Sequence, residues 1–290
     1  LVDPHPVYAA FSGNVIGTAF KQDAVREAAL GAYMGLIKQI DDQMGALFAH
    51  LRDSGQIDNT VIVITSDHGD YLGDHWLGEK DLFHDPSVRV PMIMYDPSPE
   101  ADATRGTVSD ALVESIDLLP TFVDLAGGTP RYEWLEGRSL MPLMRGETPS
   151  DWRKYTISEY DFSITPMAGR LDLAPKNARL FMVADDRWKF MHAEGGFPPM
   201  LFDLQNDPHE LNDLGRDPTY GAAVADCYDR LFEWARRSSQ RTTISDQQID
   251  ERRGKTRRKG IVLGIADDTA ADENAEILSL YRGKARQRFV

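Results

Sequence analysis

Apolar residues recur every three or four positions between Asp23 and Arg52, which is typical of an amphipathic helix. The members of this stripe are Ala29, Tyr33, Leu36, Ile37, Ile40, Met44, Leu47, Phe48 and Leu51. Gly55 is suited to end the helix. A run of β-branched residues follows at Val61–Thr65, which predicts a strand buried on both faces, as in a parallel sheet covered by helices. Helix, turn and strand in this order predict half of a doubly wound α/β unit.

Shorter apolar runs later in the chain predict further strands. They lie at Val88–Tyr95, Tyr155–Tyr160, Arg179–Ala184, Trp188–His192 and Met200–Leu204. We expect a short helix at Ser115–Ala126, with Ser115 as its N-cap, and an amphipathic helix at Thr219–Arg237. No helix is expected between Tyr155 and Thr219, so the last four runs predict an antiparallel sheet. The segment Ser163–Asn177 is expected to be a long loop that lines a substrate pocket.

These elements predict an α/β fold class. We expect part of a helix-covered, mostly parallel sheet over residues 1–150, followed by a smaller α+β subdomain with an antiparallel sheet over residues 151–245. A basic C-terminal extension over 246–290 completes the chain. Its run Arg252–Lys259 suggests a nucleic-acid patch when taken alone, but the acidic balance of the chain favours a surface or inter-subunit salt-bridge segment.

Composition narrows the classes of function. The 290 residues are 42% hydrophobic and 27% charged, which is an ordinary globular balance. The net charge of −14 argues against nucleic-acid binding. No apolar run approaches the ~18–20 residues of a membrane span. The single cysteine, Cys227, excludes an intrachain disulfide and fits a reducing compartment, so we expect a cytoplasmic protein. A homo-oligomer is left open.

Polar residues follow the Val61–Thr65 strand directly. In open α/β sheets, ligands bind at the carboxyl ends of the strands, which is where Asp67 and His68 stand. A carboxylate and an imidazole can hold a divalent metal, and Lys80 in the following loop could meet an anion bound to that metal. The alternative is that Asp67 and His68 form a helix cap or a loop hydrogen-bond pair. His5 lies between two prolines, and this context alone predicts an exposed loop histidine.

Other polar residues of this region are expected to be structural. His75 and His84 lie in the same loop as Lys80 and are expected to pack within it. Arg89 follows Asp85 by four residues, which predicts a salt bridge without a catalytic role.

Three sequence blocks resemble one known family. TSDHGDYLGDH followed by Lys80 and SVRVPMIMY is similar to the sulfatase branch of the alkaline phosphatase superfamily, most closely to its arylsulfatase and phosphonate monoester hydrolase group. SIDLLPTFVDLAGG at Ser115–Gly128 and LFDLQNDPHELNDLG at Leu201–Gly215 resemble two further signatures of that family, in the same order.

The resemblance implies a role for four residues. Asp67 and His68 would be metal ligands, Lys80 would bind an oxygen of the sulfate or phosphonate group, and His5 would act as general acid or anion contact. The substrate would be a small anionic ester. The cofactor would be a divalent metal ion, Ca²⁺, Mn²⁺ or Mg²⁺. Many sulfatases carry Asn where His68 stands, and an imidazole ligand favours Mn²⁺ over the family's usual Ca²⁺.

One part of the family pattern is missing. The nucleophile of the family is a Cys or Ser in a C-x-P-x-R segment, with the Cys oxidised to formylglycine, and no such segment occurs here. Cys227 lies in the amphipathic Thr219–Arg237 helix and cannot take that role. We therefore interpret the chain as the C-terminal part of a hydrolase of sulfate esters or phosphonate and phosphate esters, inactive by itself, with its nucleophile upstream. The alternatives are a phosphoryl-group transferase of the same superfamily and a non-catalytic module with a degenerate sulfatase fold.

Overall fold

The computed structural model describes residues 3–130, 132, 135–236, 251 and 275. The chain divides into two compact units, one of Leu1–Tyr160 with Leu180–Arg241 and one of Asp161–Arg179 with Thr242–Val290. The basic run Arg252–Lys259, and with it nearly all of the extension predicted at 246–290, lies outside the described residues.

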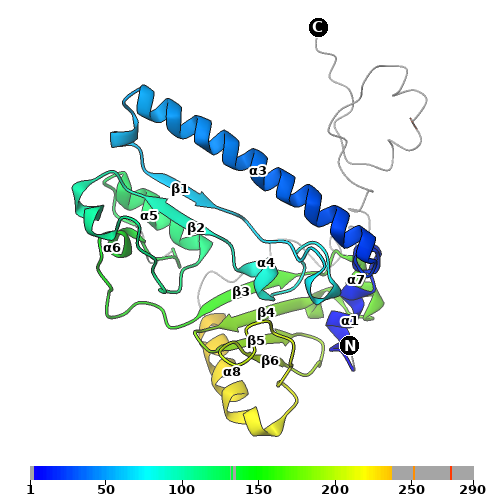
Figure 1. Ribbon diagram of the computed structural model, residues 1–290. Helices are drawn as coiled ribbons and strands as arrows, with labels where there is room; N and C mark the ends of the chain where they lie inside the picture. Colours follow the sequence, from blue (N-terminus) through cyan, green and yellow to red (C-terminus); the bar gives the residue numbers. More distant parts are fainter. Residues whose placement is uncertain (1–2, 131, 133–134, 237–250, 252–274, 276–290) are drawn as a thin grey trace. The chain divides into compact units, whose positions relative to one another are not determined.

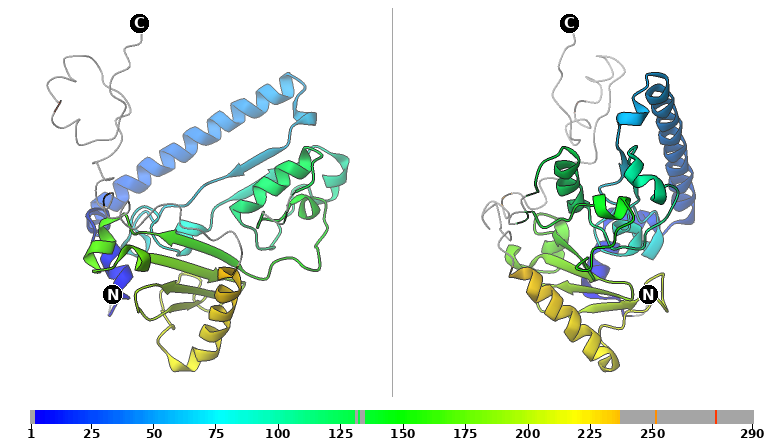
Figure 2. Two further views of the ribbon diagram at one scale, coloured as in Figure 1. Left: turned by 180° about the vertical axis from the view of Figure 1, so that it is seen from behind. Right: turned by 90° about the vertical axis from the view of Figure 1, so that its left-hand side faces the viewer.

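A long helix and a two-stranded sheet form one part of the first unit. Helix α3 (Asp23–Asp53) confirms the helix predicted from the apolar stripe. The strand predicted next is β1 (Ile62–Thr65), which pairs with β2 (Met92–Tyr95). The pairing is antiparallel, with Ile62 opposite Tyr95 and Thr65 opposite Met92. Helix α3 runs alongside β1 (Figure 1, Figure 2), so the mixed α/β class is confirmed.

The partner that the described residues give β1 is antiparallel, an arrangement that mostly parallel sheets also contain. The burial expected for this part of the chain needs correction. Strand β1 is half-buried instead of buried on both faces, and Leu36, Ile40 and Leu47 of the α3 stripe are exposed. The physical reason is that a strand becomes buried on two faces only between further strands and covering layers, and the described residues supply one neighbouring strand.

Short helices connect these elements. Their bounds are α1 (Pro6–Ser12), α2 (Val15–Phe20), η1 (Ile57–Asn59), η2 (Asp74–Trp76), α4 (Asp85–Val88), η3 (Pro99–Thr104), η4 (Ser115–Asp117), α5 (Leu118–Leu125) and α6 (Met141–Met144). The strand predicted from Val88 begins only at Met92, because α4 extends to Val88 and Pro91 offers no amide hydrogen to a ladder. The predicted cap Ser115 is not the capping residue. Glu114 and Asp117 form a capping box there instead.

A four-stranded sheet forms the other part of the first unit. Its strands are β3 (Thr156–Asp161), β4 (Arg179–Ala184), β5 (Trp188–Ala193) and β6 (Met200–Asp203), in that order. The β4–β5 and β5–β6 pairs are antiparallel, as predicted.

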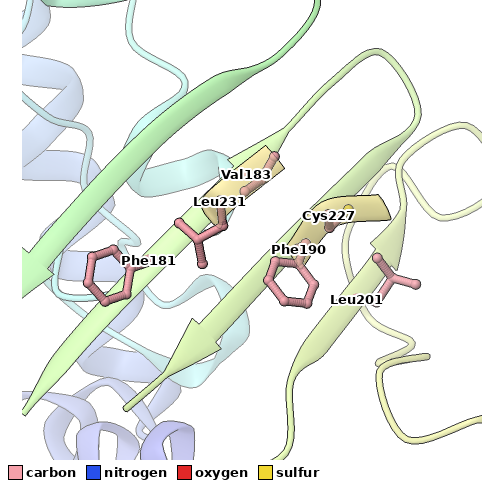
Figure 3. Close-up of a cluster of buried hydrophobic side chains, with 6 residues drawn as sticks. All are labelled: Phe181, Val183, Phe190, Leu201, Cys227 and Leu231. Carbon is pink, nitrogen blue, oxygen red and sulfur yellow. The ribbon is translucent and has the colours of Figure 1, made fainter. Parts of the chain in front are cut away.

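A helix covers one face of this sheet. The turn η6 (Pro218–Tyr220) leads into helix α8 (Gly221–Ala235), close to the predicted helix. A buried cluster joins the two layers (Figure 3) and consists of Phe181, Val183, Phe190, Leu201, Cys227 and Leu231. Burying each large side chain of the cluster stabilises the contact between helix and sheet by roughly 1.5–3 kcal/mol.

The second unit is described chiefly between Asp161 and Arg179. The segment Ser163–Asn177, predicted to be a loop, carries helix α7 (Pro166–Arg170) and the turn η5 (Pro175–Asn177). The prediction missed them because each is a single turn that begins with a proline, too short to show an apolar period. Among the described residues, no helix has both the length and the apolar character needed to cross a bilayer.

Candidate functional site

The candidate site begins where β1 ends. Strand β1 stops at Thr65, and Asp67 and His68 follow in an open turn. Gly69 then passes against α4, and its N–H donates to the Ser87 carbonyl at 2.7 Å. A Cβ atom at position 69 would lie 2.0 Å from the Pro86 carbonyl oxygen, so the close approach requires glycine.

Asp67, His68 and Lys80 come together in this turn. Lys80 Nζ lies 2.8 Å from His68 Nε2, and His68 Nε2 lies 3.4 Å from Asp67 Oδ2. The side chains of Asp67 and His68 are 84% and 40% exposed, so a dissolved ligand has access to them. Three of the four residues predicted from the sequence therefore share one location.

The hydrogen bonds of His68 define which of its nitrogens can bind a cation. Nδ1 lies 2.8 Å from the Gly69 carbonyl oxygen, which can only accept, so Nδ1 carries the proton of the neutral ring. Nε2 then presents its lone pair, and Lys80 donates to it. A backbone carbonyl that fixes the ring in this way is a common partner of metal-binding histidines.

The Asp67 carboxyl is favoured in its charged form. Desolvation is the largest single influence and acts to raise its pKa. The neighbouring His68, backbone N–H groups and Lys80 together outweigh desolvation and hold the pKa below its usual value. At neutral pH the turn therefore offers a carboxylate oxygen beside the imidazole of His68.

These two donors fit a divalent cation, but they do not complete its coordination. Structural and catalytic sites use three or more protein ligands, or several oxygen donors. Among the described residues, no group of three or more His, Cys, Asp and Glu side chains is arranged to hold a metal. A metal at Nε2 would also have to displace the Lys80 ammonium, because this nitrogen has one lone pair.

The loop that carries Lys80 is closed on itself by backbone hydrogen bonds. The N–H of Tyr71 donates to Glu79 at 2.9 Å, and the N–H of Gly73 donates to Leu77 at the same distance. Several of its residues have left-handed backbone angles: Leu72, Gly73, His75, Trp76 and Glu79. Such conformations cost about 1–3 kcal/mol each for residues other than glycine, and they persist where surrounding contacts impose them.

Two histidines, His84 buried and His75 half-buried, brace this loop against α4. The rings of His75 and His84 stack with centroids 4.0 Å apart, and the Tyr71 hydroxyl lies 2.8 Å from His84 Nδ1. Burial is the main cause that lowers the pKa of both histidines, that of His84 far below its usual value. Both rings are therefore neutral packing groups, as the sequence predicted for them.

His5 lies in a different set of contacts. It is buried and caps α1, where its Nδ1 accepts the Val7 N–H at 3.3 Å. Its Nε2 lies 2.9 Å from the Pro198 carbonyl oxygen, so both ring nitrogens are engaged. Burial is the main cause that lowers its pKa. The catalytic role of His5 stays a prediction, and that role would require the ring to release one of these bonds.

Sequence reasoning missed a buried ion pair behind the site. Lys189 in β5 and Glu210 contact each other and Asp85, the first residue of α4. The available signal was a lysine inside an apolar strand. Its partners could not be predicted, because Glu210 lies 21 residues and Asp85 104 residues from Lys189 in the sequence. The predicted Arg89–Asp85 salt bridge is present at 3.3 Å and exposed on the arginine side.

Comparisons with known proteins point to one family. A family model described as Sulfatase matches residues 1–128, and one described as N-sulphoglucosamine sulphohydrolase, C-terminal, matches residues 73–237. The multifunctional alkaline phosphatase superfamily protein PehA of Trinickia caryophylli is 38% identical over 72% of this chain and 41% of its own length. An arylsulfatase of Clostridium perfringens is 32% identical over 71% of this chain and 40% of its own length.

Solved structures agree. A phosphonate monoester hydrolase from Silicibacter pomeroyi superposes with a TM-score of 0.72 at 30% identity, over 81% of this chain and 48% of that one. A phosphonate monoester hydrolase of Agrobacterium radiobacter superposes with a TM-score of 0.64 at 32% identity, over 69% of this chain and 40% of that one. The chain spans about two fifths of the length of these curated relatives.

Proposed function

The chain belongs to the sulfatase family of the alkaline phosphatase superfamily, and from this premise we propose that it carries part of the active site of a hydrolase of sulfate or phosphonate esters. The substrate would be a small anionic ester. The remaining groups of the site, including a formylglycine-type nucleophile, would come from polypeptide outside these 290 residues.

One observation carries the proposal. At the carboxyl end of β1, His68 Nε2 lies 3.4 Å from Asp67 Oδ2 and 2.8 Å from Lys80 Nζ. A carboxylate and an imidazole can supply part of the coordination of a cation, and an ammonium beside them can bind an oxyanion.

Each residue of the candidate site would have a separate role in ester hydrolysis. Asp67 and His68 would hold a divalent metal, which supplies Lewis acidity when bound. Lys80 would leave the His68 lone pair and donate to a non-bridging oxygen of the ester, where it stabilises the negative charge that develops as the ester is attacked. The loop closed at Tyr71 and Gly73 keeps the Lys80 backbone in place while its side chain moves. His5 would donate a proton to the departing alcohol.

Cys227 takes no part in this scheme. It is buried in the cluster under α8 (Figure 3), and burial raises the pKa of its thiol to about 12. It therefore remains a protonated packing group at neutral pH, unlike an activated nucleophile.

The proposal is tested with the full-length protein and Lys80→Ala. We expect hydrolysis of 4-nitrophenyl sulfate or of a 4-nitrophenyl phosphonate monoester, and a loss of roughly 10²–10³-fold in kcat/KM in the variant, because one donor to the developing charge is removed. Lys38→Ala is the matched control, since Lys38 lies on α3 in an exposed pair with Asp42.

Two results would contradict the proposal. Full activity in Lys80→Ala would remove Lys80 from the site. A full-length protein that hydrolyses neither ester would favour one of the two alternatives, a phosphoryl-group transferase or a non-catalytic module.

A further inference from the structure

A lysine and a glutamate form an ion pair in the interior of the first unit. Lys189 and Glu210 are each 2% exposed, and Lys189 Nζ lies 2.7 Å from Glu210 Oε1. Lys189 also contacts the Asp85 carboxylate. The second carboxylate oxygen of Glu210 accepts the Asp85 N–H at 2.6 Å. Asp85 is therefore held through both its side chain and its backbone.

Asp85 begins α4, and α4 holds two parts of the candidate site. The Ser87 hydroxyl donates to the Lys80 carbonyl at 2.7 Å. The Ser87 carbonyl accepts the N–H of Gly69, which follows His68, at 2.7 Å. A continuous series of contacts thus runs from β5 through α4 to the backbone on both sides of the His68–Lys80 hydrogen bond.

A buried ion pair is a poor way to gain stability, because desolvating two charges offsets their attraction. The neighbouring positions of β5, Phe190 and Met191, are filled by apolar side chains that bury well. The charged pair provides a directional contact, because the Glu210 carboxylate accepts the Asp85 N–H at the start of α4. Fixing a distant backbone is a role that an apolar pair of the same volume would not perform.

We propose that Lys189 and Glu210 are positioning residues that fix α4 and thereby the spacing of His68 and Lys80. The catalytic consequence rests on the proposed function, whereas the mechanical part concerns this chain alone. Among the described contacts, none joins Lys189 or Glu210 to Asp67, His68 or Lys80, so both residues act through α4.

The mechanical part is tested by hydrogen exchange of single amides in the 290-residue chain. The Gly69 N–H reports the contact between the turn and α4, and the Leu231 N–H, in α8, reports the stability of the sheet and its helix. In Glu210→Gln we expect the Gly69 amide to exchange roughly tenfold faster, with Leu231 unchanged. Asp185→Asn is the matched control, because Asp185 is 9% exposed in its side chain, and its side-chain partners among the described residues are Arg230 on α8 and the N–H groups of Arg187 and Trp188, none of them in α4.

The outcomes are distinct. An unchanged Gly69 rate in Glu210→Gln overturns the proposal, and so does equal acceleration at Gly69 and Leu231, which would mean general loosening. If Glu210→Gln fails to fold, the double variant Lys189→Met with Glu210→Gln removes both charges and is measured in the same way.

The catalytic part is tested in the full-length protein at a temperature where every variant stays folded. We expect Glu210→Gln to lower kcat/KM roughly tenfold and Asp185→Asn to leave it within about twofold, because displacing a charge-stabilising group is costly. Selective exchange at Gly69 with unchanged kcat/KM would overturn the catalytic role. If the full-length protein hydrolyses neither ester, the proposed function fails, and the exchange result still decides the mechanical part.

Discussion

At the scale of single residues, glycines in this chain have two different environments. Gly69 lies so close to α4 that an added Cβ would be 2.0 Å from the Pro86 oxygen, whereas Gly35, inside α3, has no atom within 4 Å of its ideal Cβ apart from its chain neighbours and the nearby backbone of its own helix. The first glycine is required by a contact, and the second costs helix stability without a steric reason among the described residues.

The same substitution should therefore have opposite effects at these two positions. We expect Gly69→Ala to lower the free energy of unfolding by about 1–3 kcal/mol, since α4 must move to admit the methyl group. Gly35→Ala should raise it by about 0.5–1 kcal/mol. Urea unfolding of the 290-residue chain measures both. A neutral Gly69→Ala would show that the turn does not press against α4.

The residues of the site differ in how far the sequence could reveal them. Asp67 and His68 follow a strand directly, and Lys80 lies in the next loop, so a local pattern was enough to predict their neighbourhood. Glu210 could not be found in this way, because its contact with Asp85 spans 125 residues and arises only when the sheet and α4 pack. His5 shows the opposite case: a histidine predicted to reach the site is engaged by Val7 and Pro198.

At the scale of elements, helix α3 and strands β4 to β6 were predictable, because each has an uninterrupted pattern of apolar residues in its sequence. The single turns α4 and α7 were not, since four or five residues show no period. The burial of β1 was overestimated because burial depends on neighbouring layers, which a local sequence pattern does not contain.

Helix α3 allows this distinction to be measured. Leu47 and Leu51 lie one turn apart on the same stripe, yet they are 51% and 8% exposed. In the 290-residue chain we expect Leu47→Ala to change the free energy of unfolding by less than about 0.5 kcal/mol. Leu51→Ala should cost about 2–4 kcal/mol, because it removes buried methyl groups and leaves a cavity. Equal costs in urea unfolding would mean that the exposed part of the stripe is covered in solution.

At the scale of the whole molecule, the candidate site is a partial set of ligands in an acidic chain. Net charge of −14 attracts cations in general, but only specific donors hold one. The described residues offer Asp67 and His68 without a third acidic or imidazole partner. A metal bound by this chain alone should therefore be held weakly, and its affinity should depend on any group that competes for the same lone pair.

Lys80 is that competing group, so removing it should strengthen metal binding even though Lys80 belongs to the candidate site. Its ammonium donates to His68 Nε2, so a metal must displace it and then tolerate a nearby positive charge. In the 290-residue chain, Lys80→Ala should strengthen Mn²⁺ binding several-fold, on the order of 1 kcal/mol for one charge in a solvated site. His68→Ala should weaken binding, and Lys38→Ala should leave it unchanged. Calorimetric titration with Mn²⁺ measures all three. Weaker Mn²⁺ binding in Lys80→Ala would mean that the metal binds elsewhere or that the lysine supports it, because removing a competitor can only free the nitrogen.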